Sequence, residues 1–100
     1  MTKKISILAL ETLIDQYHNI HLIDVREEHE YYAGHIPSAV NFPLSQLTNK
    51  FDQLDKDKEY YLVCQSGGRS VRASQFLESK GYKTINVDGG TEAWRGKLEV

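Results

Sequence analysis

The segment that decides the fold is "EYYLVCQSGGRSVRASQFLESKG", residues 59–81. It opens with a continuous apolar run ending in Cys64, as the buried strands of a parallel sheet require. A helical pattern follows from Arg69 to Lys80, and Gly81 is placed to end it. The apolar face of this helix is expected to carry Ala73, Phe76 and Leu77. The segment therefore predicts a buried strand, a tight loop and a helix in succession.

Short strands and helices alternate along the rest of the chain. Further strands are expected at residues 4–6, 20–26, 39–42 and 83–88. Helices are expected at residues 10–17, 27–34 and 44–51, a helix or turn at 90–97, and a charged surface turn at 52–59. The first helix should bury one face made of Leu10, Leu13, Ile14 and Tyr17. This alternation predicts an α/β fold, with a mainly parallel sheet of about five short strands and helices on both faces.

Length and composition narrow the class of protein. The 100 residues suffice for one domain, expected over residues 1–100, and 40% hydrophobic with 26% charged residues is a globular balance. The net charge of -2 and the lack of a basic run argue against a nucleic-acid partner. The apolar start is short, is interrupted by Glu11 and has no cleavage site, and no segment approaches the roughly 20 apolar residues of a membrane span. We expect a cytoplasmic monomer without a membrane partner.

Cys64 is the only cysteine of the chain. A disulfide framework within the chain is therefore excluded, which fits a reducing compartment. The four histidines are scattered as His18, His21, His29 and His35. They give no closed set of zinc ligands with one cysteine, so no metal site is expected.

The loop after Cys64 is a candidate anion-binding site. It consists of Gln65, Ser66, Gly67, Gly68, Arg69 and Ser70. The first N–H groups of a helix lack internal partners, and glycines allow the loop to curl into a nest of such groups. The helix dipole adds roughly half a positive charge and Arg69 a full one. Such surroundings lower a cysteine pKa from about 8.5 to roughly 3.5–7.5, so we expect a thiolate nucleophile rather than a buried apolar side chain.

The spacing within this loop distinguishes two reactions. Arg69 follows Cys64 in a C-x4-R arrangement, whereas cysteine phosphatases use C-x5-R to encircle a tetrahedral phosphate. The shorter loop makes a tighter cradle, which suits a terminal sulfur carried on the cysteine. No second cysteine is present to resolve Cys64 as a disulfide, which disfavours thioredoxin-like and arsenate-reductase chemistry.

The sequence resembles the single-domain rhodaneses, a family of sulfurtransferases. The loop "CQSGGRS", residues 64–70, resembles the C-x-x-G-x-R active loop of that family. The upstream stretch "DVREEHEYYAGHIPSAVNFP", residues 24–43, resembles its first signature, and "VDGGTEAW", residues 87–94, its closing Gly-Gly and Trp. The similarity runs in the family's order over nearly the whole chain.

This resemblance implies a rhodanese-like three-layer fold and transfer of a sulfane sulfur. Cys64 would take the outer sulfur of thiosulfate or a persulfide, hold it as a persulfide, and pass it to a thiol or to cyanide. Two half-reactions on one group imply ping-pong kinetics. The amides of residues 65–69 would hold the anionic sulfur as an oxyanion hole holds its oxygen, and no metal or organic cofactor is required.

Several other residues have a structural and a functional interpretation. Arg69 is equally expected to bind the anionic end of the donor or to pair with a buried acid that braces the loop. Asp24 and Arg26 are expected to be structural in the first place: Asp24 is a candidate anchor for the loop amides or for Arg69, and Arg26 has attraction of an anionic donor as its alternative role. His35 is expected to be a hydrogen-bonded framework residue, and Ser70 to bond locally. Packing is expected for Trp94, and for Tyr31 and Tyr32 with the edge of the pocket as the alternative; exposure to solvent is expected for Arg72.

The sequence leaves alternatives for the sulfur donor and for the function. The loop has one cation, whereas more basic loops match dianionic thiosulfate better, so a small persulfide or a protein persulfide is an alternative donor. The chain could also serve mainly as an interaction or sulfur-relay module with little turnover of its own. A cysteine phosphatase is the third possibility, and the short loop disfavours it.

Overall fold

The computed structural model describes residues 3–17 and 19–100 and contains a sheet of five strands paired in parallel. The strands are β1 (Lys3–Ser6), β2 (His21–Asp24), β3 (Val40–Asn41), β4 (Glu59–Val63) and β5 (Lys83–Asp88). Their order is β1-β5-β4-β2-β3, which places β4 at the centre and β1 and β3 outermost. The carboxyl ends of β4 and β2 therefore share one rim of the sheet.

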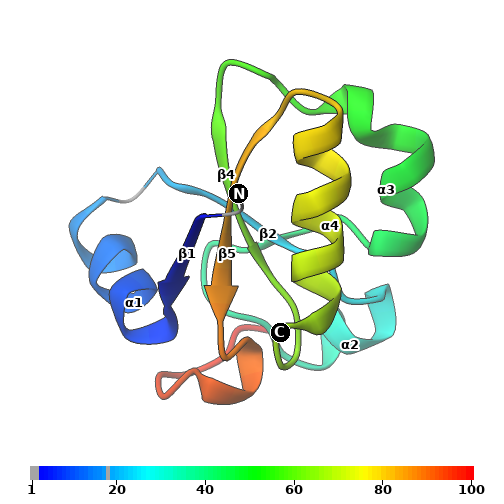
Figure 1. Cartoon of the computed structure of the whole chain (residues 1–100). Helices are drawn as coiled ribbons and strands as arrows, with labels where there is room; N and C mark the ends of the chain where they lie inside the picture. The colour runs from blue at the N-terminus through cyan, green and yellow to red at the C-terminus, as the bar shows by residue number, and fades with distance from the viewer. Residues whose placement is uncertain (1–2, 18) are drawn as a thin grey trace.

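Helices cover both faces of the sheet (Figure 1). They are α1 (Ile7–Gln16), α2 (Glu28–Ala33), α3 (Leu44–Lys50) and α4 (Gly68–Ser79), with 3-10 turns η1 (Phe51–Gln53) and η2 (Thr91–Ala93). Helices α3 and α4 lie together on one side of the strands, and α1 lies on the other. The predicted three-layer α/β architecture is thus confirmed. In the part of the chain that the structure describes, no helix is long and apolar enough to cross a membrane.

The central strand β4 supplies both cores, because successive side chains of a strand point to opposite faces. Leu62 belongs to the core beneath α3 and α4, together with Ala73 and Leu77. Val63 belongs to the core beneath α1, together with Leu10. All five side chains have no exposed surface. This double burial fixes the end of β4, where Cys64 follows.

Some element boundaries differ from the sequence prediction. Helix α1 begins at Ile7, three residues early, because the Ser6 Oγ accepts a hydrogen bond from the Ala9 N–H at 3.1 Å and caps the helix there. Tyr17 follows the helix and is 55% exposed, so its assignment to the buried face was wrong. The strand expected over residues 20–26 is shorter at both ends, and β3 is half as long as expected.

Candidate active site

Cys64 directly follows β4, and its side chain is 1% exposed. The Gly67 N–H donates a hydrogen bond to the Cys64 Sγ at 2.9 Å. The Sγ–H donates to the Ser70 Oγ at 3.4 Å, and the Ser70 hydroxyl donates to the Gly67 carbonyl at 3.1 Å. The sulfur therefore lies inside the loop, and Ser70 bonds locally within it.

The loop lowers the pKa of the Cys64 thiol. Burial is the largest single influence and raises this pKa. It is outweighed by hydrogen bonds that the thiolate accepts from backbone N–H groups of Ser70, Gly67 and Ser66 and from the Ser70 hydroxyl, which donates to the sulfur once the thiol has lost its proton. Helix α4 begins at Gly68, so these donors lie in its amino-terminal turn or just before it, where N–H groups have no helical partner. Gly67 has a φ of +122°, which only glycine adopts readily and which curls the loop around the sulfur.

Arg69 is held by an acid from another element. Its Nη1 and Nη2 donate to the Oε1 and Oε2 of Glu30 at 2.6 and 2.8 Å, a bidentate pair between α4 and α2. The hydrogen bonds from Arg69 are the main reason that the pKa of Glu30 falls from 4.5 to about 2. Arg69 thus pairs with an acid, as one of its two expected roles requires, and this acid is partly exposed rather than buried.

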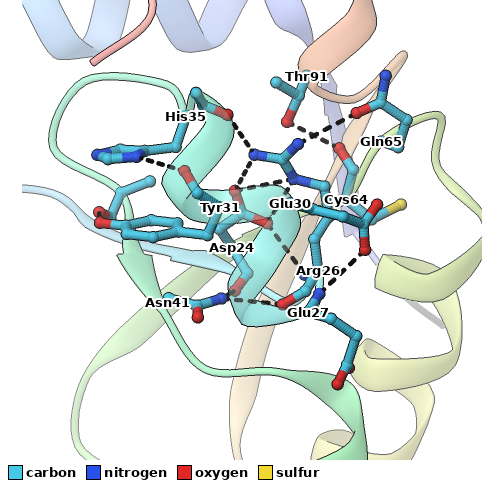
Figure 2. Close-up of polar contacts among 12 residues, drawn as sticks. Asp24, Arg26, Glu27, Glu30, Tyr31, His35, Asn41, Cys64, Gln65 and Thr91 are labelled. Carbon is cyan, nitrogen blue, oxygen red and sulfur yellow. Dashed lines mark hydrogen bonds and ion pairs between the residues drawn. The ribbon is translucent and has the colours of Figure 1, made fainter. Parts of the chain in front are cut away.

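Arg26 and Asp24 form a buried ion pair next to the loop (Figure 2). The Arg26 Nε lies 3.1 Å from both Asp24 carboxylate oxygens, and its Nη2 lies 2.9 Å from Oδ2. Its remaining bonds run to the Gly34 carbonyl at 2.7 Å and the Gln65 Oε1 at 3.2 Å. Both side chains therefore have structural contacts, but the subsidiary roles are corrected: Asp24 binds Arg26 instead of Arg69, and Arg26 is 4% exposed and bonded on all three nitrogens, so it does not face a donor.

The back of the loop is held by the segment after β5, which sequence reasoning missed. The Thr91 N–H and Oγ1 both donate to the Cys64 carbonyl, at 2.8 and 3.0 Å, and the Glu92 N–H donates to the Gln65 carbonyl at 3.1 Å. A Cβ on Gly90 would lie 2.4 Å from the Gln65 oxygen, so only glycine fits this approach. The glycine pair at residues 89–90 was the available signal for this contact.

These rear contacts orient the donors at the front. In a trans peptide, the carbonyl and the following N–H point in opposite directions. Binding the Gln65 carbonyl from behind therefore turns the Ser66 N–H toward the Cys64 sulfur, where it helps to lower the pKa. The side chain of Gln65 points away to Arg26, so this residue contributes its backbone to the cradle.

His35 is part of the framework around Arg26. Its ring stacks on Tyr31 with centroids 3.7 Å apart, and its Nδ1 lies 2.9 Å from the Tyr31 carbonyl oxygen. Its backbone exchanges two hydrogen bonds with Glu99, at 2.8 and 2.9 Å. These contacts match the expected framework role, and none reaches Cys64 in the described part of the chain.

Of the other residues considered for the site, some pack in the interior and others are exposed to solvent. Tyr31 donates from its hydroxyl to the Ala39 carbonyl at 2.6 Å, and Trp94 packs against the core beneath α1. Tyr32 is 65% exposed, so its expected core packing was wrong, whereas Arg72 is exposed as expected. Among residues 3–17 and 19–100, no group of three His, Cys, Asp or Glu side chains could hold a metal ion, and His18 lies outside the described residues.

This fold and loop place the chain among known proteins. The family model of the rhodanese-like domain matches residues 7–97, so the chain belongs to that family. It is 44% identical over 97 residues to a Bacillus subtilis protein named "Putative sulfurtransferase YtwF", covering 97% of this chain and 94% of that protein. It is 36% identical over 97 residues to "Putative sulfur carrier protein YrkF" of the same organism, covering 96% of this chain but about half (52%) of that protein.

Solved structures agree with this assignment. A rhodanese-like domain protein from Staphylococcus aureus superposes with a TM-score of 0.90 at 32% identity, covering 99% of this chain and 98% of that one. The fold is therefore rhodanese-like, and the family relationship supports sulfur transfer as the general activity.

Proposed function

We propose that Cys64 carries a sulfane sulfur from a donor to an acceptor. The observation that carries this proposal is the ring of N–H groups around the Cys64 Sγ, with Gly67 at 2.9 Å and a lowered thiol pKa. The thiolate attacks the outer sulfur of the donor and forms a new S–S bond. If the donor is thiosulfate, its S–S bond breaks and sulfite leaves with the electron pair; if it is a persulfide, a thiolate leaves.

The second half-reaction empties the site. A thiolate or cyanide attacks the outer sulfur of the Cys64 persulfide, and the S–S bond breaks with its electron pair on Cys64. The products are a new persulfide or thiocyanate and the original thiolate. Because the same ring of N–H groups can face an anionic sulfur in both states, it acts as a preorganised oxyanion-hole-type site. Donor and acceptor balance both steps without a further cofactor.

Intact-protein mass measurement tests this proposal. Incubation with thiosulfate or a small persulfide should add one sulfur atom, which cyanide should remove. Cys64→Ser is the matched control: it should keep the fold and gain no sulfur. A protein that gains no sulfur from either donor, or a Cys64→Ser variant that turns over normally, would show the proposal to be wrong.

A sulfur-relay role is the second candidate, favoured by the similarity to a protein named as a sulfur carrier. In that case one equivalent of sulfur loads rapidly onto Cys64, whereas turnover with cyanide stays slow. Comparing single-turnover loading with steady-state turnover separates a relay from a free-standing enzyme. Hydrolysis of an aryl phosphate at a rate comparable to sulfur transfer would instead favour a phosphatase.

We also propose that residues 1–100 act as one rhodanese domain, monomeric and cytoplasmic. An unpaired thiol on the active loop suits a reducing compartment. A sulfur donor and a thiol acceptor, small or carried on a protein, are its partners.

A further inference from the structure

Both arginines associated with the active loop are paired with carboxylates. Arg69 lies within the loop and makes a bidentate pair with Glu30. Arg26 bonds to the loop through Gln65 and is paired with Asp24. The side-chain charge around the cradle is therefore balanced, and an anion bound there is held mainly by backbone N–H groups.

The carboxylate of Glu30 is fixed from two directions. It accepts the backbone N–H of Glu27 at 3.1 Å, as the third helical residue of a capping box, and it accepts both Arg69 nitrogens. Its pKa of about 2 keeps it ionised throughout the physiological range. Glu27 and Glu28 stand near it in sequence, but their carboxylates accept hydrogen bonds from Ser45 and Gln46. Neutralisation of Arg69 is thus a permanent feature of the site.

We propose that Glu30 makes the site selective for singly charged sulfur donors over doubly charged ones. By neutralising Arg69, it makes the cradle unfavourable for a dianion such as thiosulfate and matched to a singly charged persulfide. The inference rests on the proposed sulfur-transfer function. Its physical basis is that Coulomb energy scales with both charges, so each positive charge withheld from the site costs a dianion twice what it costs a monoanion. The helix amino terminus supplies only about half a charge in compensation.

Glu30→Gln tests this role with little change of shape. The glutamine carbonyl oxygen can still accept from Glu27 or from Arg69, while the negative charge is removed. Glu28→Gln is the matched control, because it removes the same charge from the same helical turn, where the Glu28 carboxylate binds Gln46 instead of Arg69. Glu30 acts through Arg69, so it is a positioning residue, and the readout must be a ratio between donors.

The measurement is the second-order rate of sulfur loading on Cys64, followed by rapid quenching and intact mass, with thiosulfate and with 2-hydroxyethyl persulfide as donors. The wild-type protein should load faster from the persulfide. Glu30→Gln should raise the thiosulfate-to-persulfide rate ratio by about tenfold at low salt. This gain should shrink as ionic strength rises, since salt screens partly exposed charges. Glu28→Gln should change the ratio by less than about twofold.

Each outcome decides between the alternatives. An unchanged ratio in Glu30→Gln would overturn the inference, and so would a parallel loss of both rates, which would make Glu30 a purely structural brace. Faster loading of the wild type from thiosulfate than from the persulfide would also overturn it while leaving sulfur transfer intact. No loading from either donor would instead refute the proposed function on which the inference rests.

Discussion

Thr91 holds the carbonyl oxygen of Cys64 with two hydrogen bonds, one from its backbone N–H at 2.8 Å and one from its Oγ1 at 3.0 Å. The two residues are 27 positions apart in the chain. Because a trans peptide points its N–H away from its carbonyl, this contact directs the following N–H, that of Gln65, away from Thr91. The segment after β5 thus sets the orientation of the nucleophile's own peptide group.

Thr91→Val should weaken this support. The variant keeps the backbone bond to Cys64 and loses the side-chain bond, which should lower the free energy of unfolding by about 1 kcal/mol and slow sulfur loading. Urea denaturation and the loading rate measure the two effects. Thr12→Val is the control, since the exposed Thr12 hydroxyl bonds to the Leu8 carbonyl of its own helix; that change should cost less than about 0.5 kcal/mol. Equal losses in both variants would contradict the role of Thr91.

Arg26→Gln should be strongly destabilising. It leaves the fully buried Asp24 carboxylate without its cation, and breaking such a pair costs about 3–5 kcal/mol. Denaturant unfolding measures this loss. Arg72→Gln, a change of the same type at an exposed position of α4, should stay within about 0.5 kcal/mol of the wild type. If Arg26→Gln is as stable as Arg72→Gln, the pair does not support the loop.

Ser70→Ala should raise the pKa of Cys64. The Ser70 hydroxyl is among the groups that lower this pKa, and the thiolate is the form that alkylating agents attack. The midpoint of the pH profile for reaction with iodoacetamide should therefore move to higher pH. Ser66→Ala is the control, because Ser66 lowers the pKa through its backbone N–H, which alanine retains. A midpoint that is the same in both variants would exclude the hydroxyl as a contributor.

The Glu30–Arg69 pair should give stability a defined pH dependence. Its formation lowers the pKa of Glu30 from 4.5 to about 2, so its contribution is complete above pH 4.5 and is lost as the pH falls toward 2. For a partly exposed pair we expect a contribution of about 1 kcal/mol. The wild type should therefore exceed Glu30→Gln in stability at pH 7, and denaturant midpoints should converge near pH 2. A gap that is constant with pH would show that the charge of Glu30 is not its source.

The features that could be predicted from the sequence depend on neighbours in the chain. The loop from Cys64 to Arg69 and the helix after it follow from residue types within one short segment, and parallel pairing follows from strand–helix alternation. The pairing of Arg26 with Asp24 was also readable, because residues two apart at a strand end point to the same side. The sequence prediction instead gave Asp24 the loop amides or Arg69 as its partner, so the structural role was predicted without the correct partner.

The missed partners depend on the order of the strands. Glu30 is 39 residues from Arg69 and meets it because β2, which precedes α2, pairs with β4. Thr91 reaches Cys64 because β5 pairs with the other side of β4. No local pattern encodes that β2 and β5 flank β4, so the residues brought in by these strands could not be assigned. Their identity required the folded arrangement.

The outermost strands have a consequence for the behaviour of the protein at high concentration. An unpaired strand edge is a template for a strand of another chain, and proteins block such edges with short strands, lysine or proline. Here β3 is two residues long and is soon followed by Pro43, while β1 is four residues long and begins with Lys3 and Lys4. Both edges thus resist strand-to-strand association, so the sheet does not readily template aggregation.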